Sequence, residues 1–177
     1  MECPYCTYDN LEGVDLCACC GGDLTDPVAL EDKRSRMEKD LLTTRLEELA
    51  VGAHIEVPGE LPVREVVRRL NDGGCHCAIV VAEGAVAGIV TERDLVMKLA
   101  DRLPDVLADP VSQYMTPDPA TLRCTDPVVF ALNRMMVGGF RHIPLLRDGT
   151  LGGVVSVRDV LKYLVSRLDA PAAASAS

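Results

Sequence analysis

The chain has 177 residues, of which 48% are hydrophobic but only 3% aromatic, and its net charge is −9. This length suits one domain with a small appendage, and the hydrophobic fraction is ample for an aliphatic core. No apolar run approaches the roughly 18 residues of a membrane span, and the N-terminus has no signal-peptide pattern, so we expect a cytoplasmic protein. An acidic surface repels phosphate backbones, which disfavours general nucleic-acid binding.

Two pairs of cysteines stand in residues 1–25, the segment that we call the ribbon. Cys3 and Cys6 form one C-x-x-C pair, and Cys17 and Cys20 form the other after ten intervening residues. Two such pairs can present four thiolates to one tetrahedral ion, and metal binding would fold a segment too short to fold unaided. Zinc is the first expectation and iron the alternative. A disulfide scaffold fits poorly with a chain that has no secretion signal.

This segment resembles the short N-terminal zinc ribbons of many prokaryotic proteins. The shared run is C-P-x-C, then Asn, Gly, and C-x-x-C-G ending in Leu. The matching positions are Cys3, Pro4, Cys6, Asn10, Gly13, Cys17, Cys20, Gly21 and Leu24. Thr7 departs from the pattern, because such ribbons usually have Gly there, and Cys19 could compete as a ligand. The ribbon contains no Lys or Arg, so we expect a structural or protein-contact role for it.

Residues 26–50 are predicted to form a connecting helix. Asp26-Pro27 fits an N-cap followed by Pro at the first helical position, and apolar residues recur at helical spacing. We expect this helix to pack either on the repeats that follow it or on a second chain.

The rest of the chain contains one unit twice, because residues 49–99 match residues 114–164 at a constant offset of 65. The strongest block is Gly88-Ile-Val-Thr-Glu-Arg-Asp94 against Gly153-Val-Val-Ser-Val-Arg-Asp159. Each copy reads as helix, strand, strand, helix after a short extended lead-in, with a hairpin turn between the strands. A duplicated unit favours a binding module with paired sites over a single catalytic centre.

Each block also places a hydroxyl and an acid where a strand ends and a helix begins. Asp94 stands three residues after Thr91, and Asp159 stands three residues after Ser156. One interpretation is a capping box at the helix start. The other is a ligand site, because helix N-terminal N–H groups bind phosphate and a carboxylate can accept from both hydroxyls of a ribose. The two interpretations can coexist.

Residues 49–168 resemble a tandem pair of CBS domains (cystathionine-β-synthase domains), the arrangement known as a Bateman module. The resemblance is carried by Gly88–Asp94, Gly153–Asp159, the Met115-Thr-Pro lead-in and Arg141-His-Ile-Pro-Leu145. It implies an α/β (α+β) fold of two β-α-β-β-α units with pseudo-twofold symmetry, packed sheet to sheet around two clefts. CBS pairs commonly bind AMP, ADP, ATP or S-adenosylmethionine there, and they often form homodimers.

The expected domains are the ribbon, the connecting helix, the two CBS repeats and a disordered tail. Their bounds are 1–25, 26–50, 51–110, 111–168 and 169–177.

The resemblance also assigns roles to single residues. Asp94 and Asp159 match the ribose-binding acids of the family, and Thr91 and Ser156 match its phosphate-side hydroxyls. Arg141 and His142 would face the phosphates of the nucleotide held by Asp94, while Ile143 and Pro144 would line its adenine. The expected ligand-binding residues are Thr91, Arg93, Asp94, Arg141, His142, Ile143, Pro144, Ser156, Arg158 and Asp159.

The first repeat departs from this pattern. His76-Cys77-Ala78-Ile79 stands opposite Arg141-His-Ile-Pro144 and lacks the Arg and the Pro. We therefore expect the cleft of Asp94 to bind a phosphorylated nucleotide more tightly than the cleft of Asp159. Cys75, His76 and Cys77 alternate along a predicted strand, so they cannot close one tetrahedral metal site by themselves.

The leading hypothesis is a non-catalytic regulatory protein that responds to an adenine nucleotide, forms a homodimer and reports to an unidentified protein partner. One alternative is a nucleic-acid-associated regulator that docks through the ribbon. Another is a redox protein with an iron–thiolate centre, which would be red in its ferric form, whereas zinc is colourless.

Overall fold

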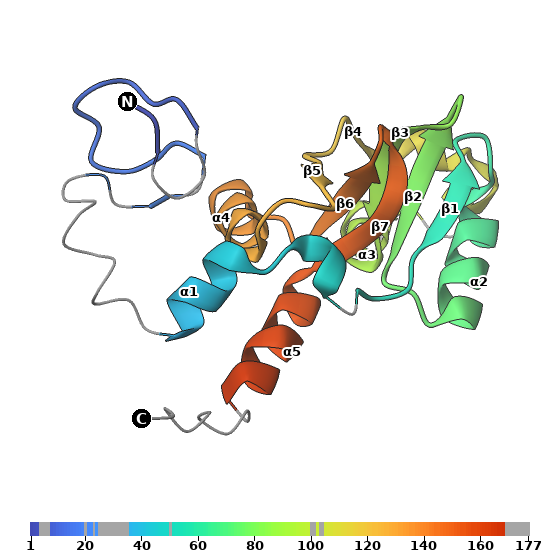
Figure 1. Ribbon diagram of the computed structural model, residues 1–177. Coiled ribbons are helices and arrows are strands. Elements are labelled where there is room, and N and C mark those ends of the chain that lie inside the picture. The colour runs from blue at the N-terminus through green and yellow to red at the C-terminus, as the bar shows by residue number, and fades with distance from the viewer. Residues whose placement is uncertain are drawn as a thin grey trace. The chain divides into compact units, whose positions relative to one another are not determined.

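Two copies of one strand–helix–hairpin–helix unit make up most of the structure (Figure 1). This computed structural model describes residues 1–3, 8–19, 21–22, 24, 36–49, 51–99, 102 and 105–168. The helices and strands in chain order are α1 (Arg36–Thr43), η1 (Leu46–Glu48), β1 (Ile55–Pro58), α2 (Val63–Gly73), β2 (Cys77–Ala82), β3 (Ala85–Thr91), α3 (Glu92–Leu99), η3 (Asp105–Ala108), η4 (Val111–Gln113), β4 (Thr116–Pro117), β5 (Leu122–Arg123), α4 (Val128–Gly138), β6 (His142–Arg147), β7 (Thr150–Ser156) and α5 (Val157–Leu168), where η marks a 3₁₀ helix.

The chain divides into two compact units. The first unit comprises Met1–Ala50, Thr125–Arg141 and Val157–Ser177, and the second comprises Val51–Cys124 and His142–Ser156. The second repeat therefore contributes α4 and α5 to the first unit and its strands to the second unit.

The second unit contains two sheets with the same internal register. One has the order β1-β2-β3-β4 and the other β5-β6-β7. In each sheet a parallel pair is followed by an antiparallel hairpin, and both hairpins carry a register shift at the equivalent position. Cys77 pairs with Thr91 as His142 pairs with Ser156, so the ladder repeats at the offset of 65. The predicted duplication is confirmed.

Proline and glycine set the limits of the first helix in each repeat. α2 begins directly after Pro62 and α4 directly after Pro127, where a residue without an N–H costs no helical hydrogen bond. Both helices end at a glycine in the left-handed conformation, Gly74 with φ 58° and Gly139 with φ 66°. The first helix of each repeat therefore has the same start and stop signals.

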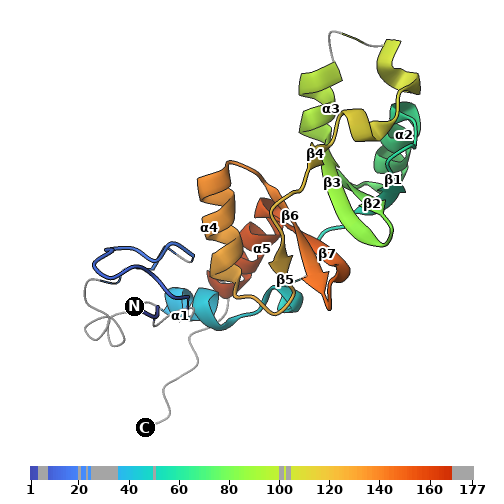
Figure 2. The ribbon, with the colours of Figure 1, turned by 90° about the horizontal axis from the view of Figure 1, so that it is seen from above.

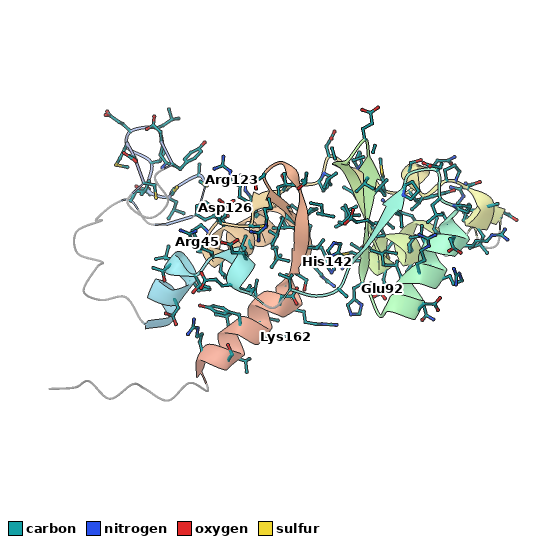
Figure 3. The ribbon with its side chains drawn as sticks, turned by 45° about the vertical axis from the view of Figure 1, so that its right-hand side comes forward. Arg45, Glu92, Arg123, Asp126, His142 and Lys162 are labelled. Carbon is teal, nitrogen blue, oxygen red and sulfur yellow. The ribbon has the colours of Figure 1, made fainter. Side chains whose placement is uncertain are left out.

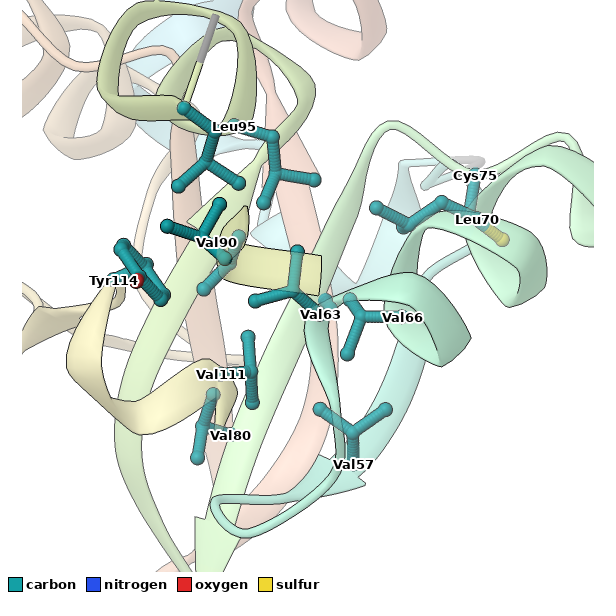
Figure 4. Packing of buried hydrophobic residues seen from close by; sticks show 13 residues of the cluster. Val57, Val63, Val66, Leu70, Cys75, Val80, Val90, Leu95, Val111 and Tyr114 are labelled. Carbon is teal, nitrogen blue, oxygen red and sulfur yellow. The ribbon is translucent and has the colours of Figure 1, made fainter. Parts of the chain in front are cut away.

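The core of the first repeat fills the space between its sheet and its helices (Figure 4), and α2 and α3 cover one face of that sheet (Figure 2). Its buried members are Val57, Val63, Val66, Leu70, Cys75, Ala78, Val80, Val90, Leu95, Leu99, Val106, Val111 and Tyr114. Most are aliphatic, as the composition predicts.

A second buried cluster joins the two sheets. Ile79 of β2 and Ile89 of β3 pack with Val154 of β7, which confirms the predicted packing of one sheet on the other. Cys77 belongs to this cluster, whereas Cys75 belongs to the core under the helices. The two thiols are therefore buried in different clusters.

The start of α2 is hydrogen-bonded to the segment that precedes the second repeat. Val63 N donates to Asp109 O at 2.9 Å, and Val111 N donates to Leu61 O at 2.9 Å. These bonds hold residues 109–111 against the start of the helix.

The start of α4 makes the same bonds in the first unit, 65 residues along. Val128 N donates to Thr44 O at 3.0 Å, and Leu46 N donates to Asp126 O at 2.9 Å. Figure 3 shows Arg45 and Asp126 close together at this point. Residues 44–46 therefore make the same backbone hydrogen bonds at the start of α4 as residues 109–111 make at the start of α2.

This contact corrects the predicted helix over 26–50. α1 ends at Thr43, and the chain then runs extended through Arg45 into η1. Thr44 N still donates to Asp40 O, but Thr44 O accepts from Val128 N and Leu46 N donates to Asp126 O, so helical bonding ends there. Residues 26–35 of the expected helix and the tail at 169–177 lie outside the described residues.

The expected packing of α1 on the repeats is confirmed. α1 lies beside α4 (Figure 1 and Figure 2). Next to it, the Thr44 hydroxyl and the Tyr163 hydroxyl of α5 are 2.8 Å apart. Asp40 Oδ2 lies 3.6 Å from Nε of Arg167. In the part of the chain that the structure describes, no helix is both long and apolar enough to cross a bilayer.

Candidate functional site

The end of β3 and the start of α3 form a hydrogen-bonded corner. Asp94 Oδ2 accepts from the backbone N–H of Thr91 at 3.0 Å and from the Thr91 hydroxyl at 2.6 Å. In return, Asp94 N donates to Thr91 Oγ1 at 3.2 Å. This reciprocal pair confirms the capping-box interpretation. Both bonds into the carboxylate use Oδ2, and Oδ1 takes part in neither.

The corner brings a hydroxyl and a carboxylate to the start of a helix. Thr91 and Asp94 are both half-buried, so each is fixed in place yet partly accessible to solvent. Arg93 is exposed on the first turn of α3. A hydroxyl, a carboxylate and the positive end of a helix therefore meet within four residues.

The second block occupies equivalent places in the chain. Ser156 ends β7, and Asp159 is the third residue of α5, as Asp94 is the third residue of α3. Asp159 is only 4% exposed, whereas Asp94 is half-buried. The repeated acids therefore differ in their accessibility.

Three of the predicted ligand-binding residues of the second repeat lie on β6. His142 is half-buried, while Ile143 and Pro144 are buried and pair with Val155 and Val154 of β7. Because the Ile143 side chain is fully buried, a ligand at this strand would meet its backbone rather than its side chain.

The candidate residues are divided between the two units. The second unit holds Thr91, Arg93, Asp94, His142, Ile143, Pro144 and Ser156, and the first unit holds Arg141, Arg158 and Asp159. The exposed guanidinium of Arg141 directly precedes β6 in the chain.

Glu92 is a charged neighbour of these residues that the sequence analysis missed. Its Oε2 lies 3.0 Å from Nδ1 of His76, and its backbone N–H donates to the His76 carbonyl at 3.2 Å. The register of the β2–β3 hairpin would have predicted this pair, because Cys77 lies opposite Thr91 and His76 therefore lies next to Glu92. A carboxylate at this distance offsets any positive charge on the imidazole.

The ribbon brings two of the predicted metal ligands into one buried cluster. Cys3 and Cys17 are buried there together with Leu24, and Cys19 is packed against them. Cys17 O accepts from Gly21 N at 2.8 Å, and Cys17 N donates to Gly22 O at 2.8 Å, so the chain turns tightly after this cysteine.

Asn10 supports the sulfur of Cys17. Its Nδ2 donates to Cys17 Sγ at 3.4 Å, its Oδ1 accepts from Ala18 N at 2.9 Å, and its side chain is only 5% exposed. Cys19 N also donates to Cys17 Sγ at 3.4 Å. Two N–H groups aimed at one sulfur favour the thiolate, which is the form that binds metal.

The other two predicted ligands, Cys6 and Cys20, lie outside the described residues. Within the described part of the chain, no three His, Cys, Asp or Glu side chains gather at one point, and no disulfide links two cysteines. Cys3 and Cys17 are therefore the two predicted metal ligands that the structure describes, and both are buried.

Sequence comparison with protein families identifies the repeated unit. The family model for the CBS domain matches residues 39–101 and again residues 111–166. This chain belongs to the CBS-domain family. Its CBS pair therefore accounts for the duplicated sheets and helices, and the first match includes residues 44–46, which pair with α4. The ribbon precedes both matched ranges.

Two relatives and one solved structure illustrate the likeness. An uncharacterized 17.7 kDa protein from the bps2 3′ region of Acidianus ambivalens is 30% identical over 126 residues, covering 70% of this chain and 75% of that protein. The Arabidopsis thaliana CBS domain-containing protein CBSCBSPB3 is 26% identical over 151 residues, but this chain spans only 27% of its length. The CBS domain protein PAE2072 from Pyrobaculum aerophilum, solved in complex with AMP, is 28% identical with a TM-score of 0.60, covering 70% of this chain and 99% of that one.

Proposed function

We propose that this chain is a non-catalytic regulatory module that binds an adenosine-containing ligand, namely AMP, ADP, ATP or S-adenosylmethionine, through its CBS pair. The observation that carries the proposal is the corner formed by Thr91 and Asp94, with its fixed carboxylate at a helix N-terminus. The AMP complex of the Pyrobaculum protein supports the choice of ligand class. Regulation then requires that the ligand bind two states of the protein with different affinity.

In this proposal each residue of the corner meets a different part of the ligand. Asp94 Oδ1 accepts from the ribose hydroxyls while Oδ2 keeps the cap. The Thr91 hydroxyl, Arg93 and the first N–H groups of α3 serve the phosphates. A corner that already holds its own hydrogen bonds loses little conformational freedom when a ligand arrives.

The second repeat supplies the complementary groups. The His142 imidazole, which directly follows Arg141 in the chain, serves the phosphates, and the backbone of Ile143 and Pro144 lines the adenine. Ser156, Arg158 and Asp159 are the equivalent groups for a second ligand.

We infer that the ligand at Asp94 binds more tightly than the ligand at Asp159. At the offset of 65, the first repeat has His76 where the second repeat has Arg141, and the Glu92 carboxylate lies 3.0 Å from this imidazole. That carboxylate repels phosphate, and Asp159 itself is buried. Both features weaken binding at the second position.

Isothermal titration calorimetry of the metal-loaded protein with AMP, ADP, ATP and S-adenosylmethionine tests this proposal. We expect Asp94→Ala to weaken AMP binding about tenfold to a hundredfold, because hydrogen bonds to charged groups contribute about 1.5–3 kcal/mol. Asp159→Ala is the matched control and should weaken it less. Unchanged AMP and ATP affinity in Asp94→Ala would show that the corner is only a helix cap, and binding of none of the four ligands would overturn the proposal.

We also propose that the ribbon holds zinc through Cys3, Cys6, Cys17 and Cys20, with iron as the alternative. The hydrogen bonds to Cys17 Sγ and the burial of Cys3 support this metal site. One zinc per chain in a colourless protein is the expected result of metal analysis and absorbance spectroscopy. A red protein with one iron per chain would instead support the redox alternative.

A homodimer is the assembly that we propose. A groove of about 570 Å³ runs between α2 and α3, lined by Val63, Val67, Leu70, Asn71, Glu92, Leu95, Val96, Leu99 and Leu107. Of the lining residues, Val96 is 64% exposed, and the next residue of α3, Met97, is 74% exposed. A second copy that covered this groove would remove its apolar side chains from water.

A further inference from the structure

The buried core of the ribbon includes a side chain from outside the ribbon. Cys3, Cys17 and Leu24 are its buried members, and Phe130 of α4 is packed against them. A segment of this length cannot bury enough surface to fold by itself. The aromatic ring of α4 therefore completes the apolar core of the ribbon.

A close backbone contact fixes the ribbon to the same helix. A Cβ atom placed on Gly21, whose φ is +68°, would lie only 2.8 Å from Nδ2 of Asn133. The turn that follows the second cysteine pair therefore lies directly against α4. Phe130 and Asn133 are three residues apart and share one face of the helix, so the ribbon contacts α4 along that face.

The end of α4 is tightly connected to the chain that follows it. Gly139 ends the helix in the left-handed conformation, and a Cβ atom on Gly138 would collide with the ring of Phe140. The packing of this ring on the last turn restrains the link to Arg141. In the chain, Arg141 is followed at once by His142, Ile143 and Pro144, the residues that we assign to the ligand.

We propose that the ribbon is a metal-dependent clamp on α4, through which zinc binding changes the affinity of the CBS pair for its adenosyl ligand. Metal binding folds the ribbon, and only the folded ribbon presents its core to Phe130 and Gly21 to Asn133. The clamp restrains α4 and, through Phe140, the orientation of Arg141. The effect is reciprocal, so the ligand changes zinc affinity by the same factor. This inference rests on the proposed metal site and, for its second half, on the proposed ligand.

Hydrogen-exchange mass spectrometry of the full chain, zinc-loaded and metal-free, tests the clamp without any nucleotide. Peptides that cover α4 should exchange several-fold more slowly in the zinc-loaded protein, while peptides that cover α3 should not change. Phe130→Ala should abolish the effect of zinc on α4. Val137→Ala is the matched control, because Val137 lies two turns further along the same helix face and is 85% exposed. It should keep the effect of zinc.

Calorimetry of the same three proteins with AMP, each zinc-loaded and metal-free, tests the coupling. The zinc-loaded wild-type protein should differ from the metal-free protein by about fivefold or more in AMP affinity, the lower range of typical coupling. In Phe130→Ala this ratio should fall toward one, and in Val137→Ala it should remain. An equal AMP affinity with and without zinc in the wild-type protein would overturn the coupling.

The possible failures are distinguishable. Equal exchange of α4 with and without zinc in the wild-type protein would overturn the clamp, even if Phe130→Ala did not fold. A chain that binds no metal would overturn the metal site and the clamp but leave the nucleotide proposal standing. A chain that binds zinc but no AMP would overturn the nucleotide proposal, and the exchange of α4 would still decide the clamp.

Discussion

At the scale of single side chains, Asn10 supports the proposed metal site of the ribbon. Replacing it with Ala removes an N–H donor from Cys17 Sγ and leaves the N–H of Ala18 without its acceptor. We expect zinc affinity to fall about 10- to 100-fold, as is usual when a residue that supports a metal ligand is lost. Competition with a chromophoric chelator measures this, with the exposed residue Glu12 replaced by Ala as the control. Equal affinities of Asn10→Ala and the wild-type protein would contradict the role of Asn10.

At this scale the sequence predicts residues whose function follows from local spacing, and it misses those that depend on three-dimensional contacts. The capping pair of Thr91 and Asp94 lies within four residues, so its spacing alone reveals it. Glu92 beside His76 depends on the hairpin register. Phe130 in the ribbon core depends on a contact between segments more than 100 residues apart, which no local pattern encodes.

Among the elements, the duplicated hairpins and helices follow the predicted pattern because each is specified locally by turn residues and apolar periodicity. The helix over 26–50 is the exception. Its apolar spacing continues past Thr43, but the bonds of Thr44 and Leu46 to the start of α4 replace helical bonding there. A long-range backbone contact therefore overrides local propensity. Thr44-Arg45-Leu46 does not resemble Asp109-Pro110-Val111, so the sequence does not reveal this contact.

The two hairpin turns provide a test within one molecule. Glu83 and Asp148 occupy the same turn position with φ of 52° and 51°, each followed by a glycine with positive φ. Asn and Asp tolerate this conformation better than Glu does. Glu83→Asn should therefore raise the free energy of unfolding by up to about 1 kcal/mol, measured by urea denaturation of the zinc-loaded protein. Asp148→Glu should lower it by a similar amount, and a stabilising Asp148→Glu would contradict the argument.

For the whole molecule, the apolar groove between α2 and α3 is the surface on which we propose that a second copy packs. Val96 lies at this groove and is exposed, so Val96→Glu would place a charge where a second copy is proposed to pack. We expect the wild-type protein to sediment at twice its 19.1 kDa chain mass at micromolar concentration, and Val96→Glu to sediment as a single chain. Leu11→Glu is the control, because Leu11 is 82% exposed but lies in the ribbon, and it should remain dimeric. A monomeric wild-type protein, or a dimeric Val96→Glu, would show that no second copy covers this groove. If the dimer is confirmed, AMP titrations of Val96→Glu will show whether ligand affinity depends on the packing of the two chains.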